Sequence, residues 1–151
     1  MIFQFSEALA LFNPETMRRT SERFPLTLSL DLEAEVDEED ISVDFATAYD
    51  PRFVLPVLCQ LLSSEVYIDK HLKFLEVGAL HLTLSSLSSK DRAMRCAGYT
   101  VLARLTAAME AAKLSQEKQV WTHVISLLRH GIVTSNLSRA GRLSCIITQV
   151  T

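Results

Sequence analysis

The second half of the chain repeats its apolar positions at the spacing of helices. Apolar residues recur three and four positions apart, which is typical of helices that bury one face. Asp50 followed by Pro51 favours a helix start there, because aspartate caps free N–H groups and proline needs no donor. The four predicted helices are 51–62, 69–87, 90–113 and 115–131, with the start of a fifth over 138–150. Residues 69–87 are apolar nearly all round, so we expect this helix at the centre, with a strand as the competing interpretation.

The first 48 residues have a different pattern. Residues 3–12 could form a short amphipathic helix that Asn13 and Pro14 end. Residues 25–36 alternate apolar and polar positions, as a half-buried strand does, but no second strand of similar quality is present to pair with them. We therefore interpret them as an extended segment lying on another surface, in this chain or in a partner. The acidic run 37–44 is predicted to be a mobile linker.

These elements predict an all-α fold. Helices joined by short loops are usually antiparallel neighbours, and their pairing suggests an armadillo/HEAT-like α-solenoid segment, with a compact bundle as the alternative. We divide the chain into an irregular acidic N-terminal lead-in, residues 1–48, and a helical domain, residues 49–151.

Charge and cysteine content narrow the classes of protein. Residues 1–50 hold 3 Lys or Arg against 12 Asp or Glu, whereas residues 51–151 hold 12 against 6, so the front is acidic and the back is basic. No stretch of about 20 apolar residues is present to span a membrane. Three widely spaced cysteines argue against a disulfide framework, and their apolar neighbours predict buried thiols.

Candidate chemistry is sparse. The four histidines lack metal-ligand spacing, and no nucleophile or phosphate-loop motif is present, so we expect no catalytic residues, no metal, no cofactor and no small-molecule substrate. The candidate contact residues for RNA or a protein partner are basic and lie on the third predicted helix: Arg92, Arg95, Arg104 and Lys113. An ordinary solvated polar face is the competing interpretation. The acidic linker could also fold back on this face and cover it.

Ordered blocks of residues resemble a known family, the nucleolar pre-ribosomal-associated protein 1 family of Npa/Urb ribosome-assembly scaffolds, in its C-terminal domain. The blocks are Tyr49–Pro56, Lys73–Leu80, Leu84–Ser89, Met94–Tyr99 and Val101–Ala103, followed by Glu110, Gln119 and Gly131–Val133. The resemblance covers roughly residues 49–135 and fades after Asn136. We therefore expect the family's helical domain to be incomplete here.

The resemblance implies a non-enzymatic helical-repeat scaffold of the nucleolus. Such proteins support assembly of the large (60S) ribosomal subunit and maturation of 5.8S and large-subunit rRNA. The partners it implies are pre-ribosomal proteins and assembly factors, with pre-rRNA as a further partner and no membrane. Two alternatives stay open: a generic helical-repeat adaptor, and a direct RNA-binding module that uses the Arg92 and Arg95 face.

Overall fold

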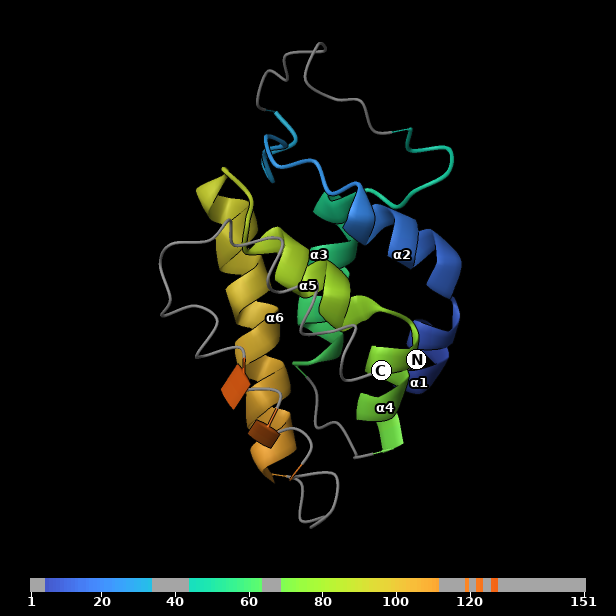
Figure 1. Cartoon of the computed structure of the whole chain (residues 1–151), viewed down its shortest axis with the longest axis vertical. Coiled ribbons are helices and arrows are strands. Elements are labelled where there is room, and N and C mark those ends of the chain that lie inside the picture. The colour runs from blue at the N-terminus through green and yellow to red at the C-terminus, as the bar shows by residue number, and fades with distance from the viewer. Residues whose placement is uncertain are drawn as a thin grey trace.

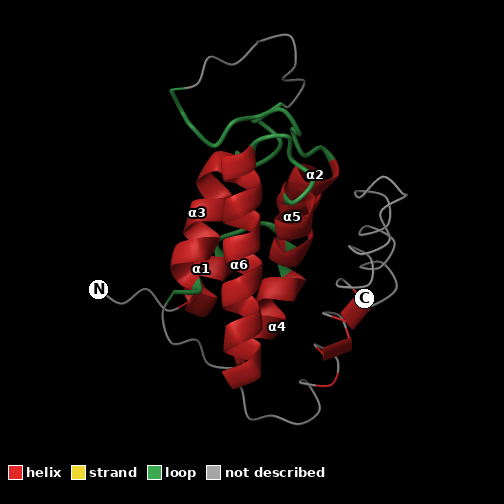
Figure 2. Cartoon of the chain, turned by 90° about the vertical axis from the view of Figure 1, so that its left-hand side faces the viewer, coloured by secondary structure: helices red, strands yellow, loops and turns green. Residues whose placement is uncertain are grey.

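A computed structural model describes residues 5–33, 44–63 and 69–111 and the isolated positions 119, 122, 123, 126 and 127. These parts of the chain form six helices and contain no strand, which confirms the all-α prediction (Figure 1). The helices are α1 (Phe5–Ala10), α2 (Pro14–Glu22), α3 (Pro51–Leu61), α4 (Asp69–Glu76), α5 (Ala79–Ser86) and α6 (Arg92–Ala111). Figure 2 shows α6 between α3 and α5, and both of these helices pack against it. The stacking of such pairs into a solenoid stays a prediction.

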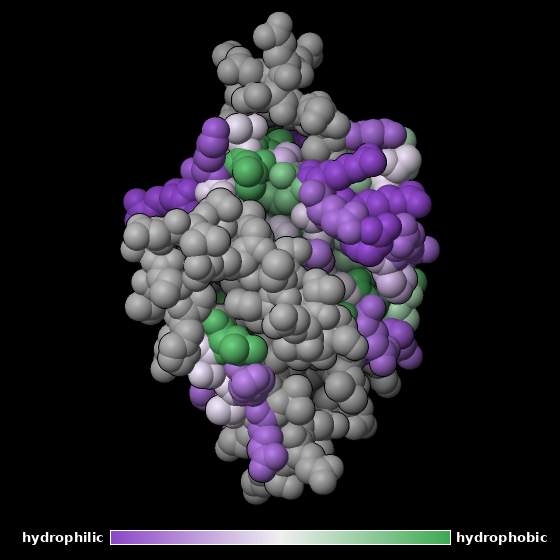
Figure 3. Space-filling view, in the orientation of Figure 1, coloured by the Kyte–Doolittle hydropathy of each residue, from purple (hydrophilic) through white to green (hydrophobic). Residues whose placement is uncertain are grey.

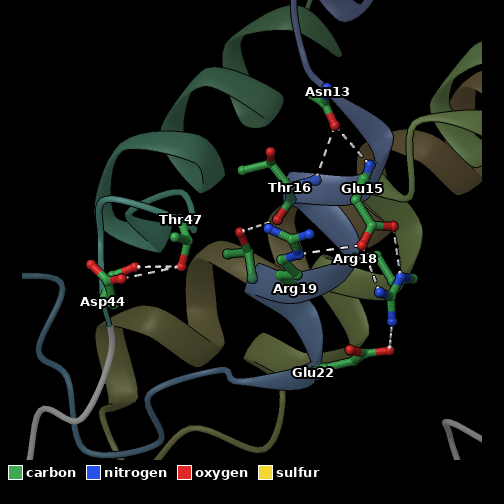
Figure 4. Close-up of polar contacts among 9 residues, drawn as sticks. Asn13, Glu15, Thr16, Arg18, Arg19, Glu22, Asp44 and Thr47 are labelled. Atoms are coloured by element: carbon green, nitrogen blue, oxygen red, sulfur yellow. Dashed lines mark hydrogen bonds and ion pairs between the residues drawn. The ribbon is translucent and has the colours of Figure 1, made fainter.

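Two helices begin at side-chain caps. The start at Asp50 and Pro51 was predicted, whereas Asn13 and Pro14 were predicted to end the helix before them and also start α2. The Asn13 side chain accepts hydrogen bonds from the N–H groups of Glu15 (2.9 Å) and Thr16 (3.1 Å), and Pro14 follows at the first position of α2 (Figure 4). Asp50 accepts a bond from the Arg52 N–H at 2.9 Å and precedes Pro51. Each cap satisfies N–H groups that have no partner within the helix, so the local sequence alone decides where these helices start.

The predicted helix 69–87 is wrong in one respect, because the structure breaks it into α4 and α5. Gly78 adopts the left-handed conformation, with φ of 77°. Its N–H donates to the Leu75 carbonyl at 2.9 Å and that of Val77 donates to the Lys73 carbonyl at 3.1 Å, which closes the end of α4. Glycine occupies this conformation without the steric cost that a Cβ brings, so the chain turns here and starts a second helix.

Helix α5 is central, as its apolar composition predicts, and the competing strand interpretation is wrong. It packs against α2, α4 and α6, and most of its side chains are buried. The main hydrophobic cluster joins Leu82 and Leu84 of α5 to side chains from the other helices. The buried members outside α5 include Leu9, Met17, Val54, Leu58, Phe74, Val101 and Leu105.

The N-terminal region is more regular than the lead-in predicted from the sequence. Residues 5–22 form α1 and α2, and Leu9 and Met17 are fully buried in the same cluster as Val54 of α3. The few apolar residues of α1 and α2 are buried only because α4 and α5 pack against these helices. The predicted acidic linker falls largely outside the described residues, which stop at Glu33 and resume at Asp44. The division at residue 48 stays a prediction.

Residues 24–30, which we name the docking segment, form no strand and lie on this chain itself. Leu28 is fully buried in a second, smaller cluster with Leu55 of α3 and Met94 of α6. The Leu26 carbonyl accepts a hydrogen bond from the Lys90 N–H at 2.7 Å, in the connection between α5 and α6. The predicted packing on another surface is therefore confirmed for this segment, and that surface is intramolecular. The predicted extended conformation is wrong here, because the Leu28 N–H donates to the Pro25 carbonyl at 3.3 Å and closes a turn.

The remaining predicted helices lie mostly outside the described residues. Of the segment 115–131, the structure describes residues 119, 122, 123, 126 and 127, all of them helical, and it describes none of 138–150. None of the described helices is both long enough and apolar enough to cross a bilayer.

Candidate interaction surface

Helix α6 carries the predicted contact residues, and its start is built by the loop before it. The Asp91 side chain accepts a hydrogen bond from the Met94 N–H at 2.8 Å, which makes Asp91 the N-cap. The Ser89 hydroxyl in turn accepts a bond from the Asp91 N–H at 3.1 Å. These two contacts follow from the local sequence and set the position of Arg92, the first residue of α6.

The depth at which α6 packs depends on Gly98. A Cβ built at this position would lie 2.1 Å from the Ser86 hydroxyl and 3.3 Å from the Thr83 carbonyl of α5. Only a residue without a side chain allows the two helices to approach so closely. The same face of α6 buries one stripe of residues: Met94, Gly98, Val101, Leu105 and Met109.

Two of the predicted arginines are engaged within the fold. Arg95 donates from its Nη1 to the Ser89 and Lys90 carbonyls, both at 2.7 Å. Arg104 donates to the carbonyl of Cys59, in the last turn of α3. Carbonyls near the end of a helix lack partners within it and carry partial negative charge, so a guanidinium is a favourable partner.

Arg92 is the predicted arginine whose charge stays available. Its side chain is exposed, and no described residue offers it a hydrogen-bond or ion-pair partner. Lys90 is exposed as well, and its ammonium likewise has no partner among the residues described. Residues Lys90, Arg92 and Arg95 therefore meet where α5 turns into α6, and we name them the basic corner.

The predicted four-residue face is not one patch in the structure. Arg104 lies 12 residues after Arg92, about 18 Å along the helix axis, and points toward α3. Lys113 lies outside the described residues. Sequence reasoning missed Lys90 as a contact residue. Its position two residues before Arg92, at the start of the predicted helix 90–113, was the signal that could have found it.

Most other basic side chains whose surroundings are described are paired. On α2, Arg18 contacts Glu15 at 2.7 Å and also Glu22, and Arg19 contacts Glu15 at 3.2 Å (Figure 4). The Arg18 guanidinium holds the pKa of the Glu15 carboxyl below its usual value. Figure 3 shows hydrophilic residues over α2 and also at the upper left, where α6 begins in Figure 1. The basic corner differs from α2 in that Lys90 and Arg92 have no such partner.

Cysteines and histidines in the described parts give no sign of an activated group. Burial raises the pKa of the Cys59 thiol, and the nearby Arg104 charge offsets this only in part, which is opposite to what a thiolate nucleophile needs. Burial lowers the pKa of His81, against the weaker effect of Glu22. Within the described ranges no three metal-ligating residues converge. Cys59 is half-buried and Cys96 is exposed, so the prediction of buried thiols is wrong for Cys96.

Comparison with known proteins identifies one family. The family model for nucleolar pre-ribosomal-associated protein 1 matches residues 80–151, which include most of α5 and all of α6. The mouse protein of that name is 36% identical over 138 residues, covering 87% of this chain and 6% of the relative. The human protein of that name is 30% identical over 147 residues, covering 95% of this chain and 6% of the relative. No solved structure matches.

The matched length has two consequences. The chain spans about 6% of the length of these curated relatives, so the match does not assign the activities and partners of the whole relatives to this chain. Against the mouse and human proteins, however, the similarity extends over most of this chain, beyond the range of the family model. The predicted fading of the resemblance after Asn136 is wrong, because the family model matches through residue 151. The family that the residue blocks indicate is the one that these alignments show: the chain belongs to the nucleolar pre-ribosomal-associated protein 1 family and matches one segment of it.

Proposed function

We propose that this chain is a non-enzymatic scaffold segment in assembly of the large (60S) ribosomal subunit. In this proposal it acts in early nucleolar pre-ribosomes and supports maturation of 5.8S and large-subunit rRNA. The observation that carries the proposal is the similarity over 138 residues to a protein named for the nucleolus and for pre-ribosomes. The all-helical core supports it, because packed helices offer extended surfaces to other proteins.

The proposed partners are pre-ribosomal proteins and assembly factors. A solenoid-like arrangement of the helices, continued by helices of other segments, would present such a surface. The competing role is a generic helical adaptor unconnected with ribosomes, and the two roles differ in the particles that the chain joins.

Sedimentation of the tagged chain tests this proposal. Nuclear extracts would be separated on a sucrose gradient and probed for the tag and for precursors of each ribosomal subunit. We expect the tag in fractions that contain large-subunit precursors and 5.8S precursor RNA. A tag that stays at the top of the gradient, or that follows small-subunit precursors, would contradict the proposal.

A specific observation favours direct RNA contact as a second proposed role. Lys90 and Arg92 are exposed and unpaired among the described residues, and unpaired cations are the groups that bind RNA phosphates. The variant Lys90→Glu/Arg92→Glu reverses both charges without removing a described hydrogen bond of either side chain. Loss of pre-ribosome association with intact binding of protein partners would favour RNA contact; loss of the protein partners would favour the scaffold alone.

A further inference from the structure

The docking segment brings the start of an acidic stretch to the basic corner. The Leu30 N–H donates to Oδ2 of Asp91 at 3.1 Å, and the Leu26 carbonyl accepts bonds from the Lys90 N–H at 2.7 Å and the Ser89 hydroxyl at 3.3 Å. With Leu28 buried beneath, these contacts hold the segment against the turn between α5 and α6. In Figure 1 this segment lies at the upper end of the molecule, above the start of α6.

Two exposed carboxylates follow directly after this attachment. Asp31 is the next residue after Leu30, and Glu33 follows two positions later; both are exposed, and neither has a cationic partner among the described residues. Lys90 and Arg92 are the neighbours of Asp91. Since successive Cα atoms are about 3.8 Å apart, the acidic stretch starts within about 15 Å of both cations. Long Lys and Arg side chains can reduce that separation to less than the Debye length, about 10 Å at 0.1 M salt.

The balance of charge at this end of the molecule is close to neutral. The basic corner contributes Lys90, Arg92 and Arg95, whereas Asp31, Glu33 and the cap Asp91 contribute three carboxylates. Asp91 belongs to the helix start and cannot move away from it. The negative charges of Asp31 and Glu33 are not needed for any hydrogen bond among the described residues. Asp31 accepts one hydrogen bond, through a side-chain oxygen that asparagine also has.

We propose that Asp31 and Glu33 form a built-in electrostatic brake on the basic corner and lower its affinity for the phosphates of RNA. The inference rests on the RNA contact proposed above and adds its regulation. An RNA strand that approaches Lys90 and Arg92 meets the negative charges of these two carboxylates nearby. Binding then requires either repulsion at close range or displacement of the docking segment, and both weaken the complex.

Replacing both carboxylates by amides of nearly the same shape tests the brake. The variant Asp31→Asn/Glu33→Gln keeps the side-chain oxygen of residue 31 that accepts a bond from the residue 33 N–H at 3.0 Å. Its affinity for a single-stranded oligouridine RNA would be measured by fluorescence anisotropy beside that of the unchanged chain. We expect an increase of about threefold to tenfold at about 50 mM salt, shrinking as added salt screens the charges.

A matched control separates this local effect from net charge. The variant Glu7→Gln/Glu110→Gln removes two exposed carboxylates from α1 and from the far end of α6. Glu110 lies 18 residues beyond Arg92, about 27 Å along the helix, which is about two Debye lengths at this salt concentration. We expect a much smaller change in RNA affinity for this control.

The contrary outcomes are distinct from one another. An equal gain in the control variant, or no gain at all in Asp31→Asn/Glu33→Gln, would overturn the brake. A gain that persists when Lys90→Glu/Arg92→Glu is added would also overturn it, because the brake would then act elsewhere. Equal RNA binding by the unchanged chain and Lys90→Glu/Arg92→Glu would instead refute the RNA contact, and leave the scaffold proposal to the gradient experiment.

Discussion

At the scale of single residues, the arginines of α6 show how one residue type takes different roles. Arg92, Arg95 and Arg104 look alike in the sequence, as basic positions on one helix. In the structure Arg95 bonds carbonyls of the loop before α6, Arg104 bonds a carbonyl in the last turn of α3, and Arg92 has no polar partner among the residues described. The difference arises from what lies beside each guanidinium, which helical spacing does not indicate.

Replacing Arg95 and Arg92 separately by alanine tests this distinction. Arg95→Ala leaves the Ser89 and Lys90 carbonyls without their partner, and we expect a loss of about 1–2 kcal/mol in the free energy of unfolding. Arg92→Ala should change it by less than about 0.5 kcal/mol, as exposed unpaired side chains do. Urea unfolding followed by circular dichroism gives both values. Equal losses for the two variants would show that the contacts of Arg95 contribute no stability.

At the scale of elements, the starts of helices were predictable and one break was not. Asp50 caps α3 where the sequence places the start of that helix, and Asn13 and Asp91 cap α2 and α6 by contacts of the same kind, because capping depends on a few neighbouring atoms. The break at Gly78 was not predicted because the apolar residues of 69–87 continue on both sides of this glycine. Glycine permits the left-handed conformation but does not require it, and the packing of the Met17 side chain 3.5 Å from the Cβ position belongs to the tertiary structure.

The contact between α5 and α6 gives the prediction at this scale. In an unconstrained helix Gly98→Ala would stabilise by up to about 1 kcal/mol, but here the added methyl meets the Ser86 hydroxyl and a backbone carbonyl. We expect a net loss of about 1–3 kcal/mol and a lower Tm by calorimetry. Ser86→Ala removes the nearest atom, so the double variant should regain part of the loss. A Tm unchanged by Gly98→Ala alone would show that the helices separate at little cost.

At the scale of the whole molecule, the N-terminal region completes the core. Leu9, Met17 and Leu28 are fully buried, and their partners lie on helices α3 to α6. The Asn13 N–H donates to the Tyr49 hydroxyl at 2.9 Å, and the Tyr49 N–H donates to the Thr20 hydroxyl at 2.8 Å, which ties the region to the start of α3. A boundary drawn at residue 48 from the change in composition cuts across these contacts.

A chain that starts at residue 44 tests the importance of this packing. It would expose the surfaces that Leu9, Met17 and Leu28 cover, and each such loss costs about 2–5 kcal/mol, comparable with the stability of a small domain. We expect a broad, non-cooperative thermal transition and rapid proteolysis. The substitution Leu28→Ala is a milder version of this test, and Leu32→Ala is its matched control, because Leu28 is 0% exposed and Leu32 is 74% exposed. A sharp transition of the shortened chain would support the division at residue 48.

The sequence by itself determined the helical class, the starts of α3 and α6, the central place of α5 and the family, because these depend on local spacing and on ordered blocks of residues. Only the tertiary structure decided that the docking segment lies on this chain, that Arg95 and Arg104 are bound to carbonyls, and that Lys90 joins Arg92 beside Asp31. The physical reason is that these outcomes depend on contacts between residues up to 64 positions apart, as in Leu26 with Lys90. No local pattern of apolar and polar residues records such contacts.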